Sequence, residues 1–394
     1  MLAYSRSTEG NCRILEAAHT RCLDWAKRYG MKFAPSKYEL IHFTRSRQFN
    51  LQASVRLGGT EKLPSPEVKV LGVWLDTKLS WSAHFCAVQK KASVQIGALT
   101  RITTSTWGAS FSRARQVYSS VVRPALTYGV GVWHTPGTNT ARGLAAKLQP
   151  IQNKCLRVVT GAYKATPVRA LETETYTPPI DLYLDGRLAA FRDRLANSPV
   201  SQSIQQACKA IQRRLRNKRG RQKSHRPIPS LASDKWARTR AQHLGGATEG
   251  KRVLEAWKRR WQSSARPDAW DRVLRPPDPK VLKLHSSLCK AESSALVQFR
   301  TGCTGLAYFL NKAHVPGVES GLCSCGRGLE TPRHVLIHCS KEAERREELR
   351  GVGRGRLDFR KLLDTPAGAG VASRWIVRSE RLHQFSLARA LLYE

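Results

Sequence analysis

Acidic residues are scarce in this chain. Its 394 residues include 29 Asp and Glu against 67 Lys and Arg, which gives a formal net charge of +38 and a pI near 10.6. A charge excess of this size repels itself unless a polyanion neutralises it. Nucleic acid is the expected polyanion, because each phosphate contact releases condensed counterions. RNA and DNA are therefore the predicted partners.

Long apolar stretches are missing as well, and the opening residues 1–6 lack the apolar run of a signal peptide. An anionic membrane surface is therefore the weaker alternative, and no membrane partner is predicted. The ten cysteines are scattered, which is typical of reduced thiols and not of a secreted disulfide framework. We expect a nuclear or cytoplasmic protein, whose oligomeric state the sequence leaves open.

The apolar share of 41% and the ten Trp residues indicate a folded protein of two or three domains. Apolar residues recur at helical spacing over residues 9–29, and the predicted buried face holds Ile14, Leu15, Ala18, Cys22 and Trp25. Strands are expected at residues 1–5, Tyr38–Thr44, Ala53–Leu57 and Val68–Asp76. Further helices are expected over residues 82–102, 110–130, 141–161 and 180–196, with a closing amphipathic helix near Arg374–Leu392. The predicted fold class is mainly α with a small α/β N-terminal part.

Several blocks, in a consistent order over roughly residues 1–196, carry a resemblance to a known family. The blocks are Met1–Ser5, Asp24–Lys27, Phe33–Ile41, Val68–Asp76, Trp81–Ser112 and Tyr118–Gly129. They resemble the reverse transcriptases of non-LTR (LINE-type) retrotransposons. The resemblance implies a partial palm over residues 1–80, with a primer-gripping hairpin at Val68–Asp76, and a helical thumb over residues 81–197. A basic linker or helical region, 198–280, and a small C-terminal domain, 281–394, complete the expected organisation.

Polymerase chemistry needs carboxylates that hold two divalent cations about 3.5–4 Å apart. The family's catalytic aspartates match no position of this chain, because its first residues align just after them, and Asp24 and Asp76 fall elsewhere. The chain is therefore expected to be inactive as a polymerase. Mg²⁺ would serve only an intact parent enzyme.

Accessory positions of the family do have counterparts. Lys37 matches a lysine that acts as a general acid on the leaving pyrophosphate; the alternative is a solvated lysine in a turn. Leu71, Gly72 and Val73 match the primer grip, where glycine allows close approach of the backbone. The alternative for these three is an ordinary buried strand with a bulge.

The clearest chemical signal lies between residues 322 and 339. Cys323 and Cys325 are followed, after eight residues, by His334 and Cys339. Three sulfurs and one imidazole are ligands that Zn²⁺ prefers in a structural site. Thr331 and Pro332 predict the start of a helix that carries His334.

Alternatives remain open at this motif. The one-residue gap between Cys323 and Cys325 is tight, His338 is a rival ligand one helical turn after His334, and the residues could be free cysteines with a surface histidine. The motif also resembles the zinc-binding tail of the same retrotransposon proteins, which implies Cys323, Cys325, His334 and Cys339 as ligands of structural zinc. Cys303 and the cysteines at 12, 22, 86, 155, 208 and 289 are interpreted as structural or core residues.

A basic segment spans Lys209–Arg226, in which nine of eighteen residues are Lys or Arg and none is acidic. It is predicted to contact nucleic acid or to act as a nuclear import signal, and a solvated charge run is the alternative. The predicted contacts are Arg213, Arg214, Arg216, Lys218, Arg219, Arg221 and Lys223. Trp236, Trp257, Trp261 and Trp270 follow, and the helical spacing of Trp257 and Trp261 favours core packing over base stacking.

Three hypotheses follow from the sequence. The first is the C-terminal part of a retrotransposon RNA-directed DNA polymerase that binds nucleic acid and zinc without its own polymerase site. The second is a stand-alone nucleic-acid-binding protein of the zinc-knuckle type. The third is a non-functional transposon relic.

Overall fold

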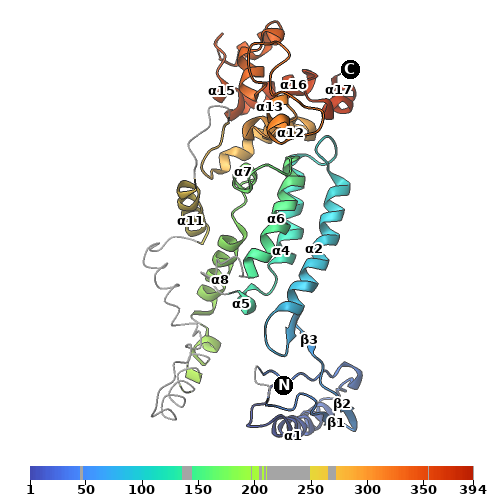
Figure 1. The fold of residues 1–394 in the computed structure, drawn as a ribbon. Helices are drawn as coiled ribbons and strands as arrows, with labels where there is room; N and C mark the ends of the chain where they lie inside the picture. Colours follow the sequence, from blue (N-terminus) through green and yellow to red (C-terminus); the bar gives the residue numbers. More distant parts are fainter. Residues whose placement is uncertain are drawn as a thin grey trace. The chain divides into compact units, whose positions relative to one another are not determined.

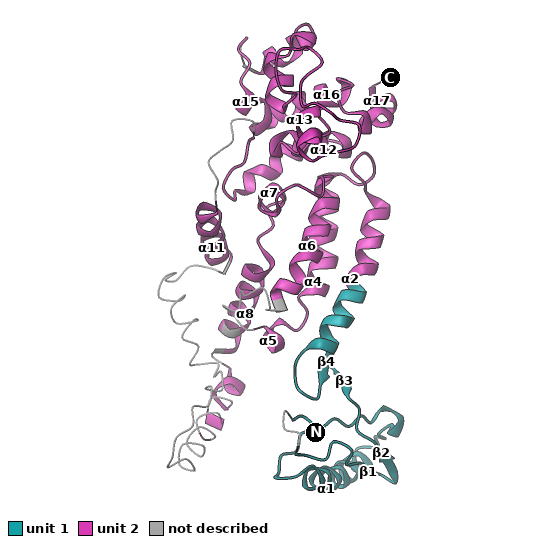
Figure 2. Ribbon diagram, in the orientation of Figure 1, with its two compact units in different colours: residues 1–91 teal, residues 92–394 magenta. Residues whose placement is uncertain are grey.

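The computed structural model describes residues 1–44, 48–134, 144–196, 198–203, 206, 207, 210, 249–264, 272–353 and 355–393. The chain divides into two compact units, Met1–Lys91 and Ala92–Glu394 (Figure 2). The described residues are mainly helical, and their strands form two antiparallel two-stranded sheets (Figure 1). This agrees with the predicted class. The boundary between the units falls within helix α2 (Ser82–Ile102).

The first unit is built on helix α1 (Thr8–Arg28), which begins where the Ser7 hydroxyl accepts a hydrogen bond from the Gly10 amide. Its buried side carries Cys12, His19 and Ala26, which recur every seven residues and so share one face. Cys12 packs with Leu40, Val55 and Leu57. The predicted face was wrong in part, because Ile14 and Trp25 are 45% and 47% exposed. The hairpin over residues 55–62, described next, packs on the side of α1 that lies next to the predicted face.

Two tight hairpins follow. Strands β1 (Val55–Leu57) and β2 (Thr60–Lys62) pair antiparallel across Gly58 and Gly59. Strands β3 (Glu67–Val70) and β4 (Val73–Asp76) pair in the same way, with Val70 opposite Val73. The two-residue turn between them holds Leu71 and Gly72 at φ values of 47° and 84°, the geometry that matches the twist of paired strands. The segment Val68–Asp76 is thus a hairpin, as the family resemblance implied, and not one continuous strand.

Two predicted strands are wrong. Residues 1–5 are irregular, and Tyr38–Thr44 contributes only one bridge, between Leu40 and Pro64. Both segments instead line an open cavity of about 1000 Å³ within this unit. Met1, Leu2 and Tyr4 are 70%, 86% and 93% exposed, because a strand needs ladder partners that no described residue supplies here.

The second unit begins with a bundle of helices after α2. In chain order its members are α3 (Phe111–Val117), α4 (Arg123–Leu126), α5 (Val130–Trp133), α6 (Leu144–Thr160), α7 (Val168–Glu174), α8 (Ile180–Ala196) and α11 (Glu249–Ser263). The helices predicted over 82–102, 141–161 and 180–196 are confirmed by α2, α6 and α8. The helix predicted over 110–130 is interrupted: Tyr118–Val122 forms a π turn just before Pro124, which has no amide hydrogen for an α-helical bond. Helix α7 was not predicted.

The rest of the second unit surrounds one buried helix, α12 (Lys290–Thr301), all of whose residues are buried. Around it lie α13 (Ala307–Lys312), α14 (Glu347–Arg350), α15 (Phe359–Asp364), α16 (Pro366–Arg378) and α17 (Ser386–Tyr393), with a 3-10 turn at Pro279–His285. The single closing helix predicted near Arg374–Leu392 is wrong. Helix α16 ends at Arg378, Glu380 takes a φ of 62°, and a 3-10 turn directs Phe385 into the core before α17 begins.

Buried polar contacts join α12 to the helical bundle. The Lys290 ammonium donates to the carbonyl oxygens of Val158 and Val159 at the end of α6, at 3.0 and 2.6 Å. The Arg300 guanidinium, 1% exposed, pairs with Glu174 of α7 and with Asp364 of α15. These contacts support the division in which bundle and C-terminal helices form one compact unit. Of the helices described, none has the length and apolarity needed to cross a bilayer.

We expect the first unit to be the less stable one. Its cluster of buried apolar side chains has four members, whereas α12 lies in a cluster of 22. In native-state hydrogen exchange of the purified chain, amides of Leu2–Ile41 should exchange faster than those of α12, because local opening costs least where few apolar contacts are lost. Equal, cooperative protection of both regions would contradict this expectation.

Candidate metal centre

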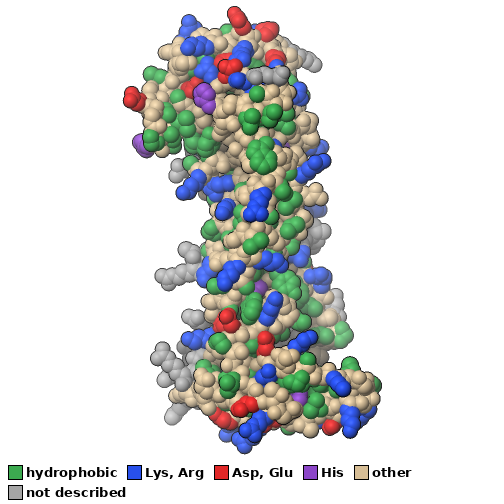
Figure 3. Space-filling model, turned by 90° about the vertical axis from the view of Figure 1, so that its right-hand side faces the viewer, with side chains coloured by type: hydrophobic (Ala, Val, Ile, Leu, Met, Phe, Trp, Pro, Cys, Tyr) green, Lys and Arg blue, Asp and Glu red, His purple; other side chains and the backbone are tan. Residues whose placement is uncertain are grey.

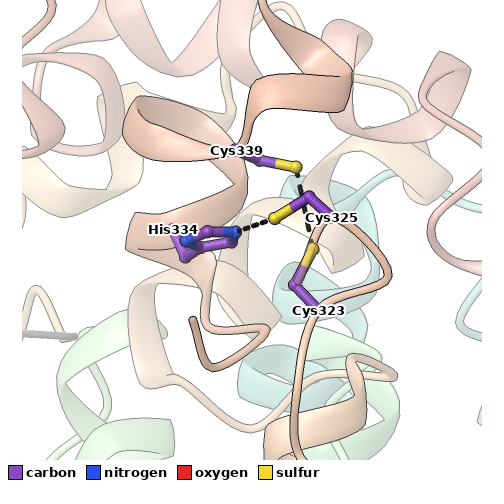
Figure 4. Close-up of side chains that lie close together, drawn as sticks. All are labelled: Cys323, Cys325, His334 and Cys339. Carbon is purple, nitrogen blue, oxygen red and sulfur yellow. Dashed lines mark hydrogen bonds between the residues drawn. The ribbon is translucent and has the colours of Figure 1, made fainter. Parts of the chain in front are cut away.

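The four side chains predicted as zinc ligands lie together in the second unit (Figure 4). One potential ligand atom from each of Cys323, Cys325, His334 and Cys339 lies within 4.8 Å of all the others. The two sulfurs of Cys323 and Cys339 are 3.7 Å apart, and Cys325 Sγ is 3.2 Å from His334 Nε2. Within the part of the chain that the structure describes, no second group of three or more His, Cys, Asp and Glu side chains converges in this way.

A short hairpin-like loop presents the first two cysteines. Leu322 and Leu329 form an antiparallel bridge, and the Cys323 amide donates to the Gly328 carbonyl at 2.8 Å. Inside this frame the Gly326 amide donates back to the Cys323 carbonyl at 2.9 Å. Gly326 has a φ of 72°, a conformation that residues with a β-carbon rarely adopt. This turn lets two cysteines that are separated by one residue face the same centre.

A π turn presents the other two ligands. The Thr331 hydroxyl accepts from the His334 amide at 3.2 Å, which is the helix start that the sequence predicted. The Cys339 amide then donates to the His334 carbonyl five residues earlier, at 2.8 Å. Residues five apart on an α-helix point about 140° away from each other, since each residue turns by about 100°. The wider turn brings His334 and Cys339 together and leaves the rival ligand, His338, exposed and outside the cluster.

The separations fit a tetrahedral zinc ion. With zinc–sulfur bonds of about 2.3 Å, the sulfur–sulfur edge of a regular tetrahedron is about 3.8 Å. The distance between the Cys323 and Cys339 sulfurs is 3.7 Å, so this pair needs almost no movement. Three sulfurs and one imidazole nitrogen also exclude Mg²⁺ and Ca²⁺ as preferred occupants, because those ions take oxygen ligands. The residues present therefore fit structural zinc.

The thiols differ in their readiness to ionise. A hydrogen bond from the Arg327 amide, assisted by His334, lowers the pKa of Cys325 to about 6. Burial raises the pKa of Cys323 to about 11. A bound cation would offset that cost, because a thiolate ligand is deprotonated when the metal binds.

The guanidinium of Arg381 lies directly behind the cluster. It donates to the sulfurs of Cys323 and Cys339, at 3.7 and 3.4 Å. Glu330 and Glu342 hold it in place, at 2.9 and 2.7 Å. The charge of this guanidinium is offset by Glu330 and Glu342, and its N–H groups remain directed at the two sulfurs. Arg381 comes from the segment between α16 and α17 and so joins the C-terminal helices to the metal loop.

Sequence reasoning missed Arg381 and its two carboxylate partners. Arg381 is 42 residues from Cys339 and 58 from Cys323, so no local pattern links it to the motif. The local sequence carries only the Cys-x-Cys spacing and the His-x4-Cys half that follows it.

The polymerase-related positions lie in the first unit. Lys37 is exposed on the 3-10 turn Pro35–Lys37, whose conformation suits the alternative of a solvated lysine. Asp24 is exposed on α1, and Asp76 accepts hydrogen bonds from the amides of Lys78 and Ser80, as a turn-forming aspartate does. Among the described residues, no group of carboxylates that could hold metal ions converges beside Lys37.

The primer-grip residues form the tip of the β3–β4 hairpin. Leu71 is 90% exposed, Gly72 follows it in the turn, and Val73 is buried. The alternative of a buried strand with a bulge is wrong, since the two residues at the tip form a regular two-residue turn. Contact with a primer end stays a prediction.

The predicted basic contacts, Arg213 to Lys223, lie outside the described residues, as do Trp236, Trp270 and Cys208. Trp257 is buried and packs on Tyr176 with ring centroids 5.6 Å apart, as expected of a core residue, and Trp261 is partly buried. Cys12, Cys155 and Cys303 are buried and Cys22 and Cys289 partly so. Cys86 is exposed, so its interpretation as a core residue was wrong.

Comparison with known proteins shows that this chain is homologous to the Pol proteins of non-LTR retrotransposons, at modest identity. It is 24% identical over 350 residues to the "Retrovirus-related Pol polyprotein from type-1 retrotransposable element R1" of Bradysia coprophila, a match that covers 86% of this chain and 31% of that protein. It is 23% identical over 296 residues to the corresponding "R1 4" protein of Nasonia vitripennis, covering 75% of this chain and 66% of the relative.

A third relative is the "Probable RNA-directed DNA polymerase from transposon X-element" of Drosophila melanogaster. It is 26% identical over 193 residues, which are 45% of this chain and 20% of the relative. The chain thus spans less than two thirds of each of these proteins. No family model matches the chain, and no solved structure matches it.

We expect the purified chain to bind one zinc ion through the cluster. Replacing His334 by Ala should abolish stoichiometric zinc, whereas the neighbouring His338→Ala should retain it, because only His334 faces the three sulfurs. Metal content after dialysis and the thiolate absorption of the Co²⁺-substituted protein measure this. Equal loss in both variants would contradict the ligand assignment.

We also expect Arg381 to strengthen zinc retention. Arg381→Leu should weaken zinc binding about 10- to 100-fold in competition with a chelator, as loss of a partner that holds metal ligands commonly does. Arg389→Leu is the matched control, because Arg389 lies in the same C-terminal segment and pairs with the exposed Glu380. Unchanged zinc affinity in Arg381→Leu would show that this guanidinium only packs against the site.

Proposed function

We propose that this chain is the RNA- and DNA-binding C-terminal part of a retrotransposon RNA-directed DNA polymerase, and that a structural zinc ion organises its C-terminal domain. The homology to retrotransposon Pol proteins over much of the chain carries the proposal. The convergence of three cysteines and one histidine supports the zinc ion, and the net charge of +38 supports the nucleic-acid partner.

The organisation proposed for the chain is that of a polymerase fragment. Residues 1–80 would be part of a palm, 81–197 a thumb, 198–280 a basic linker or helical region, and 281–394 a zinc-knuckle-like C-terminal domain. The helical hairpins of α2 to α8 and the exposed tip at Leu71 suit a thumb that follows a primer-gripping hairpin. In the parent protein this arrangement would hold the template and primer while other segments supply the polymerase site.

In this proposal the chain does not extend primers by itself, and Mg²⁺ serves only the intact parent enzyme. Phosphoryl transfer requires carboxylates that hold two cations. Asp24 and Asp76, the two aspartates within the family-like blocks, have the solvent and turn roles described above. Lys37 and the Leu71–Val73 tip would then be accessory positions, and the protein would work in the nucleus or the cytoplasm.

Binding to nucleic acid should be strong and governed by salt. If six phosphates are neutralised, the affinity for a short oligonucleotide should fall about a thousandfold between 50 and 200 mM salt. Fluorescence anisotropy of a labelled oligonucleotide, titrated with the full chain, measures this. An affinity that does not change with salt would contradict electrostatic binding. Primer extension with Mg²⁺ in the same preparation would contradict the assignment of an accessory role.

A further inference from the structure

A long stretch of this chain has no acidic residue at all. Between Asp76 and Glu172 there are 13 Lys and Arg and not one Asp or Glu. The stretch includes helices α2 to α6, and on the face drawn in Figure 3 the middle of the view shows Lys and Arg side chains without acidic ones among them. Surfaces usually mix both signs of charge, so a one-sign surface points to an anionic partner.

A groove lies on this surface, within the second unit. Its volume is about 410 Å³, and none of the described residues that line it is acidic. One wall is the end of α2 and the loop after it, and the other is α6 with the turn at its end. The polar side chains lining the groove are Thr100, Thr103, Thr104, Ser105, Lys154, Arg157, Tyr163, Gln298 and Gln384.

The floor of the groove is fixed by hydrogen bonds. The Gln298 amide donates to the Gly161 carbonyl at 3.0 Å, and Gln384 bridges Gln298 and Tyr163 at 2.6 and 2.7 Å. Gly161 has a φ of 65°, and a β-carbon there would lie 2.1 Å from Ser294 Oγ, so only glycine fits. The site is therefore built in advance of any ligand, which lowers the entropic cost of binding.

One cation in the groove is held rigidly and another is free to move. The guanidinium of Arg157 donates to the carbonyls of Asn153 and Lys164, at 3.3 and 3.0 Å, and its buried Nε has no hydrogen-bond partner among the described residues. Lys154 lies one helical turn earlier and is exposed. A fixed and an adjustable charge beside several hydroxyls are the donors that proteins commonly offer to phosphate oxygens.

The loop beside the groove also presents an aromatic ring. The Thr104 hydroxyl accepts from the amides of Thr106 and Trp107, both at 3.3 Å, and the loop closes at the bridge between Thr103 and Gly108. A β-carbon at Gly108 would lie 2.3 Å from the Ile102 carbonyl, so the close approach requires glycine. The loop is thus constrained, yet Trp107 at its tip is 52% exposed.

We propose that this groove binds the sugar–phosphate backbone of a single-stranded nucleic acid, with a base stacked on Trp107. The inference rests on the proposed nucleic-acid binding and locates it on the second unit. Lys154 and Arg157 neutralise phosphates, and the threonine hydroxyls and glutamine amides line the path of the backbone. A single strand is favoured because only unpaired nucleotides offer a free base face to an indole ring.

The test uses the full chain and labelled 15-nucleotide oligo-U, oligo-dT and a duplex of mixed sequence. Trp107→Ala should weaken single-strand binding about fivefold or more, since one base stack is lost. Lys154→Ala should reduce the slope of log affinity against log salt by about one. Trp25→Ala and Lys361→Ala are matched controls, as Trp25 is 47% exposed and Lys361 is an exposed helical lysine outside the groove. The controls should change affinity less than twofold.

The outcomes separate this inference from the proposed function. If the unaltered chain binds none of the three probes, the proposed function fails. If it binds and the groove variants behave as the controls do, the groove assignment alone is overturned. Equal losses on duplex and single strands would overturn the single-strand assignment. Tighter binding of oligo-U than of oligo-dT supports an RNA occupant that is recognised through its 2′-hydroxyls, and the reverse order supports DNA.

All four substituted side chains are exposed or half exposed, so the variants should fold, and circular dichroism verifies this. A photoreactive amino acid at position 107 gives a second readout that does not depend on affinity. It should crosslink to the single strand, whereas the same residue at position 25 should not. Crosslinking from position 25 alone would overturn the proposal.

Discussion

The second unit depends on one buried ion pair. Arg300 of α12 lies between Glu174 of α7 and Asp364 of α15, with Arg300 and Glu174 each 1% exposed. Burial raises the pKa of Glu174, so the guanidinium must stay in place to keep that carboxylate charged. Removing one partner of such a pair commonly costs about 3–5 kcal/mol. Together with the Lys290 contacts to the end of α6, this ion pair joins the bundle to the C-terminal helices.

Local chemistry made part of this structure predictable. Helical spacing indicated α1, α2, α6 and α8, and Thr331-Pro332 marked the start of the turn that carries His334. Spacing and ligand type indicated a zinc motif and left His338 as a rival, and the family resemblance implied the four side chains that converge. The pattern failed where the chain departs from regular periods, as at the π turn before Pro124 and at the break after Arg378. It also overestimated strands, because Tyr38–Thr44 has the residues of a strand and too few partners.

What the sequence could not supply were contacts between distant segments. Arg381 reaches the Cys323 and Cys339 sulfurs from the C-terminal helices, and Gln384 reaches the groove beside Gly161 from the same segment. The segment between α16 and α17 thus contributes Arg381 to the candidate metal centre and Gln384 to the candidate nucleic-acid groove. Because both sites include a residue from this short segment, the C-terminal helices contribute to both.

The burial of helix α12 has a consequence for how the sequence can diverge. Every residue from Lys290 to Thr301 is buried, although seven of the twelve are polar or charged. Each of those polar groups is matched to a partner on another element or carries a desolvation cost. Replacing Lys290, Gln298 or Arg300, even conservatively, would leave a partner on another element unsatisfied. Among diverging copies of this sequence, α12 should therefore be the slowest segment to vary, with compensating pairs of changes more frequent there than single ones.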